Sequence, residues 1–158
     1  MIEAEVSWQE GLTFRGRASR GELTVAPVDS EAVGEHFGPK ELVALGLAGC
    51  TGMDVVSILE KMHATPERFS VSARAESADT HPQYLRRVEV TYRIDGPATA
   101  DQVRRAVILS MERYCGVSAT MAGRSELVPV AVLNGEALDG LPRYGPAPAA
   151  QDVVEEVR

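Results

Sequence analysis

The chain has 158 residues, of which 44% are hydrophobic and 25% charged, and its formal net charge is -7. This length and balance are typical of one soluble globular domain, and the acidic total argues against nucleic acid or an anionic membrane as a partner. Residues 1–9 lack the features of a secretory signal, and the longest apolar run, residues 42–50, is too short to cross a bilayer. We therefore expect a cytoplasmic protein, whose cysteines are normally reduced.

The N-terminal part of the chain is predicted to form three short strands. Residues 3–8 and 12–17 alternate around a turn that ends at Gly11, and residues 22–26 form a third strand. Side chains of a strand alternate between its two faces, so Arg15 and Arg17 share the more polar face of the second strand.

A long helix is predicted for residues 39–62. Pro39 suits its first turn, and apolar residues surround most of its circumference, which is typical of a buried helix of roughly 36 Å. Gly46, Gly49 and Gly52 weaken the middle of this helix by up to about 1 kcal/mol each relative to alanine. Close approach of another backbone is the expected compensation.

The rest of the chain adds three strands and a second helix, followed by a tail. In chain order these are strands at residues 68–78 and 84–95, a helix at 99–114 and a strand at 127–133. Thr99 is a candidate N-cap of the helix, and Gly116 can end or kink it. From residue 135 we expect a loose tail with a weak terminal helical turn. The order βββ-α-ββ-α-β indicates the α+β class.

Two cysteines are the candidates for chemistry. Cys50 lies in the middle of the long helix and Cys115 at the end of the second, 65 residues later. Neither belongs to a CxxC pair and the three histidines are isolated, so no metal site and no cofactor are expected. A buried cysteine often serves only as a small hydrophobic residue. Spacing alone leaves open whether the two Cα atoms approach within the roughly 7 Å that a disulfide needs.

The surroundings of Cys50 bear on its reactivity. Its helix face is narrow and mostly apolar, and it is shared with Gly46, Leu47, Met53, Asp54 and Ser57. A thiol there stays inert unless a cation lowers its pKa from about 8.5. Arg15 or Arg17 could supply that cation, and the alternative is that both are ordinary solvent-facing strand residues.

Four segments resemble the OsmC/Ohr family, and in particular its OsmC-like subgroup. They are EGLTF at residues 10–14, GPKEL at 38–42, AGCTGMDVV at 48–56 and ERYCGVS at 112–118. The likeness extends over roughly residues 2–134, so the expected organisation is an OsmC-like domain at 1–134 and a C-terminal tail at 135–158. The family implies two antiparallel sheets around long central helices in an intertwined homodimer.

The resemblance also implies a peroxidase activity. By similarity, Cys50 is the thiol that attacks an organic hydroperoxide and becomes a sulfenic acid, and Cys115 condenses with it to a disulfide. A dithiol such as a lipoyl group would restore the pair, and Arg15 and Glu41 would assist catalysis. Apolar walls suit an alkyl or fatty-acyl hydroperoxide. The alternative is a binding or redox-sensing protein for a small apolar ligand on the same scaffold.

Two positions depart from the pattern of the family's peroxidases. Lys40 stands where they have a helper glutamate, and Glu41 lies nine residues before Cys50, about 180° away on a continuous helix. Glu41 could serve if the first turn is irregular or if it orients an arginine of the partner chain. Among the arginines Arg15 is the first choice and Arg17 the reserve.

Overall fold

The computed structural model describes residues 1–28 and 36–147. The chain divides into two compact units, Met1–Val43 and Ala44–Arg158, and each is described by itself. The predicted helical turn at the end of the tail lies outside the described residues. The predicted domain boundary after residue 134 stays a prediction.

The first unit contains the three predicted strands, which form one antiparallel sheet. Its strands are β1 (Ala4–Glu10), β2 (Thr13–Ala18) and β3 (Gly21–Val25). The turn between β1 and β2 passes through Gly11, whose φ of 52° favours glycine. All seven residues of β1 are exposed, among them Trp8. An edge strand of this kind leaves apolar surface and backbone groups available to a partner.

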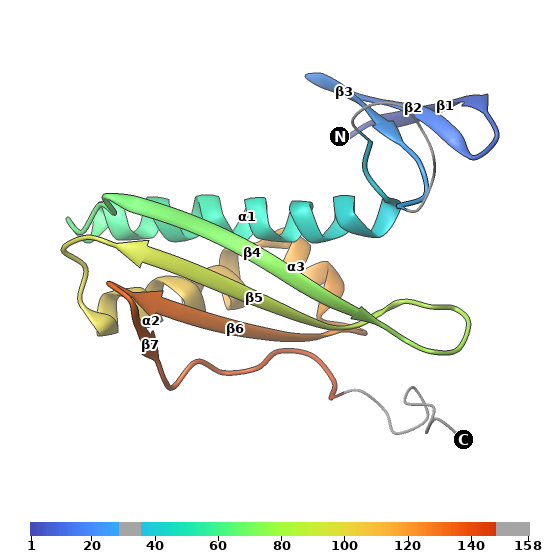
Figure 1. Cartoon of the computed structure of the whole chain (residues 1–158). Helices are drawn as coiled ribbons and strands as arrows, with labels where there is room; N and C mark the ends of the chain where they lie inside the picture. The colour runs from blue at the N-terminus through green and yellow to red at the C-terminus, as the bar shows by residue number, and fades with distance from the viewer. Residues whose placement is uncertain (29–35, 148–158) are drawn as a thin grey trace. The chain divides into compact units, whose positions relative to one another are not determined.

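The second unit combines a four-stranded sheet with a helical layer (Figure 1). The sheet order is β4 (Arg68–Ser77), β5 (Leu85–Asp95), β6 (Glu126–Leu133) and β7 (Glu136–Leu138). The helical elements are α1 (Pro39–Lys61), which begins in the first unit, then α2 (Ala100–Leu109), the π-helical turn η1 (Ser110–Tyr114) and α3 (Gly116–Met121). The predicted α+β class is confirmed, and the predicted order βββ-α-ββ-α-β is correct except that α3 and β7 are added to it.

The prediction of two antiparallel sheets is wrong for the second sheet. Strands β5 and β6 run parallel, while the β4–β5 and β6–β7 pairs are antiparallel. The physical reason is the connection between β5 and β6, which runs through α2, η1 and α3. A helical crossover of this length returns the chain to the same end of the sheet, so the next strand points the same way.

The core lies between one face of the sheet and the helices. Alternate residues of β5, from Val88 to Ile94, are fully or almost fully buried, and Leu47, Val55 and Leu59 of α1 pack in the same cluster. Burial of a leucine or valine side chain contributes about 1.5–3 kcal/mol each. The strict alternation along β5 therefore fixes which face of the sheet receives the helices.

The glycines of α1 have different environments. A Cβ on Gly52 would lie 3.2 Å from a methyl group of Val71, so this glycine lets α1 approach β4 closely. Gly46 and Gly49 have nothing within 4 Å of such a Cβ. The predicted close approach of another backbone is wrong: the neighbour at Gly52 is the Val71 side chain, and Gly46 and Gly49 face open space.

Among the described helices, α1 alone is long and apolar enough to cross a membrane. The core helix of a soluble protein can have the same length and composition. The two faces of α1 differ. Leu47, Val55 and Leu59 are fully buried on one side, whereas Leu45 and Met53 are 53% and 72% exposed. Packing against the sheet accounts for the inner face, and the outer face is apolar surface without cover in the single chain.

The second predicted helix is two elements, α2 and η1, and the short helix α3 follows it. Thr99 is confirmed as its N-cap, in a capping box with Gln102. The α-helix ends at Leu109, a π turn follows, and Cys115 then adopts an extended conformation that starts α3. Gly116 was predicted to end or kink the helix, but the break falls one residue earlier, at Cys115, and Gly116 begins α3, which was not predicted.

The segment after Gly135 is more ordered than the predicted loose tail. Strand β7 pairs with β6, and Tyr144 exchanges two backbone hydrogen bonds with Leu127 at 2.8 and 3.0 Å. Burial raises the pKa of the Tyr144 hydroxyl to about 12. Residues up to Tyr144 thus belong to the packed second unit.

Candidate active site

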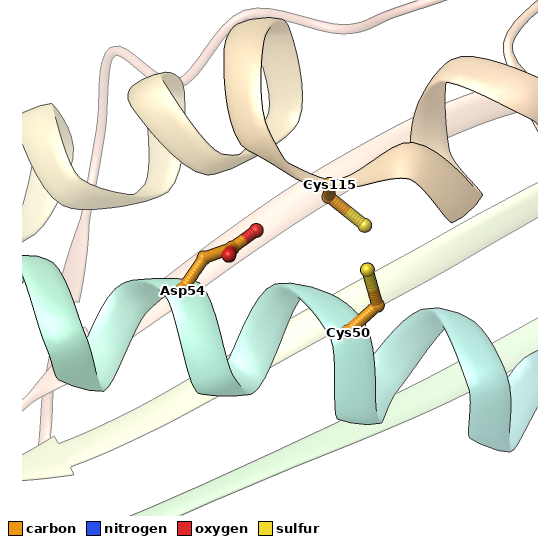
Figure 2. Close-up of side chains that lie close together, drawn as sticks. All are labelled: Cys50, Asp54 and Cys115. Atoms are coloured by element: carbon orange, nitrogen blue, oxygen red, sulfur yellow. The ribbon is translucent and has the colours of Figure 1, made fainter.

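The two cysteine sulfurs face each other across the gap between α1 and the start of α3 (Figure 2). The Sγ atoms of Cys50 and Cys115 and a carboxylate oxygen of Asp54 all lie within 4.8 Å of one another. Both cysteines are free thiols; Cys50 is half-buried, whereas Cys115 is 2% exposed. The fold thus brings the two predicted sulfurs together from segments 65 residues apart.

The position of Cys115 follows from the π turn before it. The backbone N–H of Cys115 donates to the carbonyl of Ser110 at 2.9 Å, which closes the wide turn, and the chain then leaves the helix. Its Sγ accepts from the backbone N–H of Ser118 at 3.3 Å, and the Ser118 hydroxyl donates to the Cys115 carbonyl at 2.8 Å. The sulfur is therefore held at the N-cap of α3. Such π turns occur frequently at functional sites.

Burial sets the protonation of Cys115. Burial, followed by a hydrogen bond with the Cys50 thiol, raises the pKa of the Cys115 thiol above its ordinary value, and the Ser118 backbone N–H partly opposes this rise. Neither neighbour is a cation. Cys115 is therefore a neutral thiol at neutral pH.

A buried chain of hydroxyl groups lies beside the sulfurs and ends at Asp54. The Ser110 hydroxyl donates to Asp54 Oδ2 at 3.0 Å; the Thr51 hydroxyl lies 2.8 Å from that of Ser110 and 2.6 Å from that of Tyr92. An ionised carboxylate only accepts. The Ser110 proton therefore points to Asp54, the Thr51 proton to Ser110 and the Tyr92 proton to Thr51. Burial raises the pKa of Tyr92, so it remains a donor.

Sequence reasoning placed Asp54 on the helix face of Cys50 but gave it no role. Its signal was the spacing of four residues, which puts two side chains on one face of a helix. Ser110 was counted as part of the predicted apolar stripe of the second helix, so its hydrogen bonds to Asp54 and Thr51 were not expected. Thr51 gave no signal, because only the three-dimensional pairing with Tyr92 and Ser110 shows its function.

Arg15 and Arg17 lie on β2 in the first unit. Arg15 Nη2 lies 3.0 Å from a carboxylate oxygen of Glu22, and Arg17 Nη2 lies 2.6 Å from the other. The two guanidinium groups, Arg17 first, lower the pKa of Glu22. Both arginines are about two-thirds exposed, at 66% and 71%. Their predicted role at Cys50 stays a prediction.

Glu41 has a local function at the start of α1. Its Oε2 accepts from the backbone N–H of Gly38 at 2.8 Å, which satisfies a donor at the helix N-terminus. Among the described residues of the chain, Arg15 pairs with Glu22 and not with Glu41. The helix is continuous from Pro39, so the irregular first turn that Glu41 would need is absent from α1. The catalytic role of Glu41 stays a prediction.

A small cavity of about 250 Å³ opens beside the site. Asp54, Ser57 and Lys61 of α1 line it together with Leu109 and Tyr114, among others. Tyr114 is itself exposed, so this cavity is open to solvent. Asp54 is the one member of the sulfur–carboxylate group on its wall, and neither cysteine lines it.

The α+β fold and the two facing thiols can now be compared with known proteins. The model of the family described as OsmC-like protein matches residues 32–128, and the chain belongs to this family. It is 32% identical to Protein YhfA of Escherichia coli (strain K12) over 118 residues, which are 74% of this chain and 87% of that protein.

Solved structures agree with this assignment. A hypothetical protein from Aquifex aeolicus superposes with a TM-score of 0.75 at 25% identity, over 85% of this chain and 96% of that one. An organic hydroperoxide resistance protein from Elizabethkingia anophelis superposes with a TM-score of 0.69 at 16% identity, over 85% and 96%. The expected family and its α+β fold are confirmed, whereas the intertwined homodimer stays a prediction.

The pKa of Cys115 leads to a first prediction. In a Cys50→Ala variant the remaining thiol should ionise at a higher pH when folded than in denaturant, because burial is the largest cause of the shift. The stabilisation from the neutral thiol is complete below the unfolded pKa and is lost as the pH rises through the folded pKa. Ultraviolet absorbance of the thiolate, with the Cys50→Ala/Cys115→Ala spectrum subtracted, measures this. Equal pKa values in both states would contradict it.

The hydroxyl chain leads to a second prediction. Thr51→Val keeps the shape of the side chain but leaves Ser110 without its donor and Tyr92 with only the Met111 sulfur, at 3.7 Å, as acceptor. The free energy of unfolding should fall by about 1–3 kcal/mol. The control is Thr120→Val on α3, whose exposed hydroxyl donates to the Gly116 carbonyl and should contribute less than about 0.5 kcal/mol. Urea unfolding at one protein concentration measures the free energy of unfolding of both variants. An equal decrease in both would show that the buried hydroxyl chain stabilises the protein no more than an exposed hydroxyl does.

Proposed function

We propose that this protein is a thiol peroxidase that reduces organic hydroperoxides. The observation that carries the proposal is the pair of reduced sulfurs within 4.8 Å, one half-buried and one buried. The structural relative from Elizabethkingia anophelis, named for organic hydroperoxide resistance, supports the same class of substrate. An acidic chain with reduced thiols suits the cytoplasm, which is the compartment we propose.

The two cysteines have different tasks in this reaction. The Cys50 thiolate attacks the O–O bond of the hydroperoxide, takes one oxygen as a sulfenic acid and releases the alcohol. Cys115 then attacks the Cys50 sulfur, and the disulfide forms as water leaves. An external dithiol, such as a lipoyl group, reduces the disulfide with two electrons. Cys50 is assigned the first step because it is the more accessible of the two sulfurs.

Asp54 is the acid–base group that the second step needs. The buried Cys115 thiol must lose its proton to attack, and its raised pKa makes that loss unfavourable without a base. The Asp54 carboxylate lies within 4.8 Å of both sulfurs and is oriented by Ser110. It can accept the proton of Cys115 and pass it to the departing hydroxide, which leaves as water.

Activation of Cys50 requires a cation, which we propose comes from a second copy of the chain. In an intertwined homodimer, Arg15 of the partner, or Arg17 in its place, would stabilise the thiolate, and Glu41 would orient the guanidinium. The fully exposed strand β1 and the uncovered outer face of α1, with Leu45 and Met53, support such a dimer. Water would otherwise contact an apolar surface that soluble proteins usually cover.

A second function is favoured by an apolar groove between α1 and β4. Its volume is about 600 Å³, and its walls include Leu45, Met53, Val56, Phe69 and Val71. A groove of this size and lining can hold a small apolar molecule. The second candidate is therefore a binding or redox-sensing protein for such a ligand.

The peroxidase proposal predicts loss of thiols on addition of peroxide. One equivalent of cumene hydroperoxide should convert both thiols of the wild-type chain to a disulfide. Cys50→Ser should consume no peroxide, and Cys115→Ser should react once and then over-oxidise at Cys50, because no second sulfur protects the sulfenic acid. Thiol counting and intact-mass spectrometry measure these outcomes. Unchanged thiols in accessible, folded protein would exclude the enzyme.

The binding alternative predicts a response that does not depend on sulfur. A medium-chain fatty acid should raise the unfolding temperature of the wild type and of Cys50→Ser equally, because the groove does not include the Cys50 side chain. Val71→Asp, which places a charge in the wall, should remove the rise, whereas Glu76→Gln on the same strand should not. Stabilisation that Val71→Asp leaves unchanged would refute groove binding.

A further inference from the structure

We propose that the reduced site binds one thiophilic divalent cation, with Zn²⁺ as the best fit. The ligands are Cys50 Sγ, Cys115 Sγ and one carboxylate oxygen of Asp54. Among residues 1–28 and 36–147, this is the one group of three His, Cys, Asp or Glu side chains close enough to share a metal ion. The spacing of the two cysteines in sequence gave no reason to expect it, because the group is assembled only by the fold.

The distances suit a tetrahedral ion after a small contraction. All three ligand atoms lie within 4.8 Å of one another. Zn–S bonds of about 2.3 Å and Zn–O bonds of about 2.0–2.2 Å require two sulfurs roughly 3.8 Å apart at tetrahedral angles. The two sulfurs must therefore approach each other by up to about 1 Å, which rotation of the two side chains can supply. Cys50 and Asp54 are four residues apart on α1, the spacing that lets two residues of one helix ligate the same zinc ion.

The site has the outer support that metal ligands usually need. Ser110 donates to Asp54 Oδ2 at 3.0 Å, Thr51 hydrogen-bonds Ser110, and Tyr92 hydrogen-bonds Thr51. Hydrogen bonds of this kind orient ligating carboxylates and contribute strongly to metal affinity. The 250 Å³ cavity that Asp54 lines brings solvent to one of the three ligands.

The chemistry of the donors selects the ion. Sulfur ligands favour zinc, cadmium and copper(I) over magnesium and calcium. Binding forms two metal–sulfur bonds and one metal–oxygen bond, each thiol gives its proton to solvent, and no atom is oxidised or reduced. Three protein ligands leave a fourth tetrahedral position for water or an external thiol.

Metal binding and disulfide formation exclude each other, because both use the same sulfur electron pairs. The inference does not rest on the proposed peroxidase activity, since a chain that is inert to peroxide could still bind the ion. Conversely, an active peroxidase that binds no zinc would overturn this inference alone. The two failures are therefore distinguishable.

The experiment is a zinc titration of the full, reduced chain by calorimetry, with Co²⁺ absorbance as a second readout. We expect one ion per chain and, with Co²⁺, an intense tetrahedral spectrum with thiolate charge transfer. Cys50→Ser, Cys115→Ser and Asp54→Asn should each weaken binding by at least about tenfold. Asp101→Asn, at an exposed carboxylate on α2, should leave it unchanged.

The same titration can overturn the proposal. Absence of zinc binding by the reduced wild type refutes the site, and so does binding that survives either cysteine variant. Binding that is unchanged in a folded Asp54→Asn variant shows that the carboxylate is not a ligand. Should that variant unfold, the wild type decides: prior oxidation to the disulfide must abolish binding, and a Co²⁺ spectrum without thiolate bands refutes the assignment.

Discussion

The hydrogen bond between Thr51 and Ser110 joins the long helix to the π turn, directly beside the two sulfurs. Thr51 follows Cys50 in sequence, and Ser110 accepts the backbone N–H of Cys115. The bond is buried and runs between elements that the sheet already presses together, so it fixes how α1 and η1 align along each other. The distance between the sulfurs depends on that alignment. Apolar packing stabilises the fold, and this buried hydrogen bond fixes the relative position of the two elements that carry the cysteines.

A pair of thiols beside a carboxylate can react in more than one way, and its surroundings decide between them. Cys115 is buried and its pKa is raised, so its thiol is protonated and shielded from solutes. The more accessible Cys50 meets solutes first. Asp54 can carry a proton during oxidation or share an ion with the reduced sulfurs. If both proposals hold, oxidant and metal compete for the same two reduced sulfurs.

Most of the fold could be predicted from local patterns. The alternation of apolar residues predicts the strand β5, because every second side chain of a strand faces the core. The apolar residues around most of the circumference of α1 predict a buried helix. The parallel direction of β6, the short helix α3 and the strand β7 depend on long-range pairing, which no local pattern records. At the site, the helix position of Cys50 was predictable. Its distance from Cys115 was not, because it is set by the π turn. The proposed placement of Arg15 near a sulfur of a second chain is likewise not recorded in any local pattern of the sequence.

The sulfur of Cys115 has a second role, as the acceptor that begins α3. An N-cap acceptor of the usual oxygen type contributes about 0.5–2 kcal/mol to its helix, and here a sulfur accepts from Ser118 in the same way. When that sulfur bonds to another sulfur or to an ion, its electrons and position are no longer those of the free thiol. A change in the chemical state of Cys115 therefore changes the acceptor that caps the first turn of α3. A single atom thus links the reactivity of the site to the order of the segment that follows it.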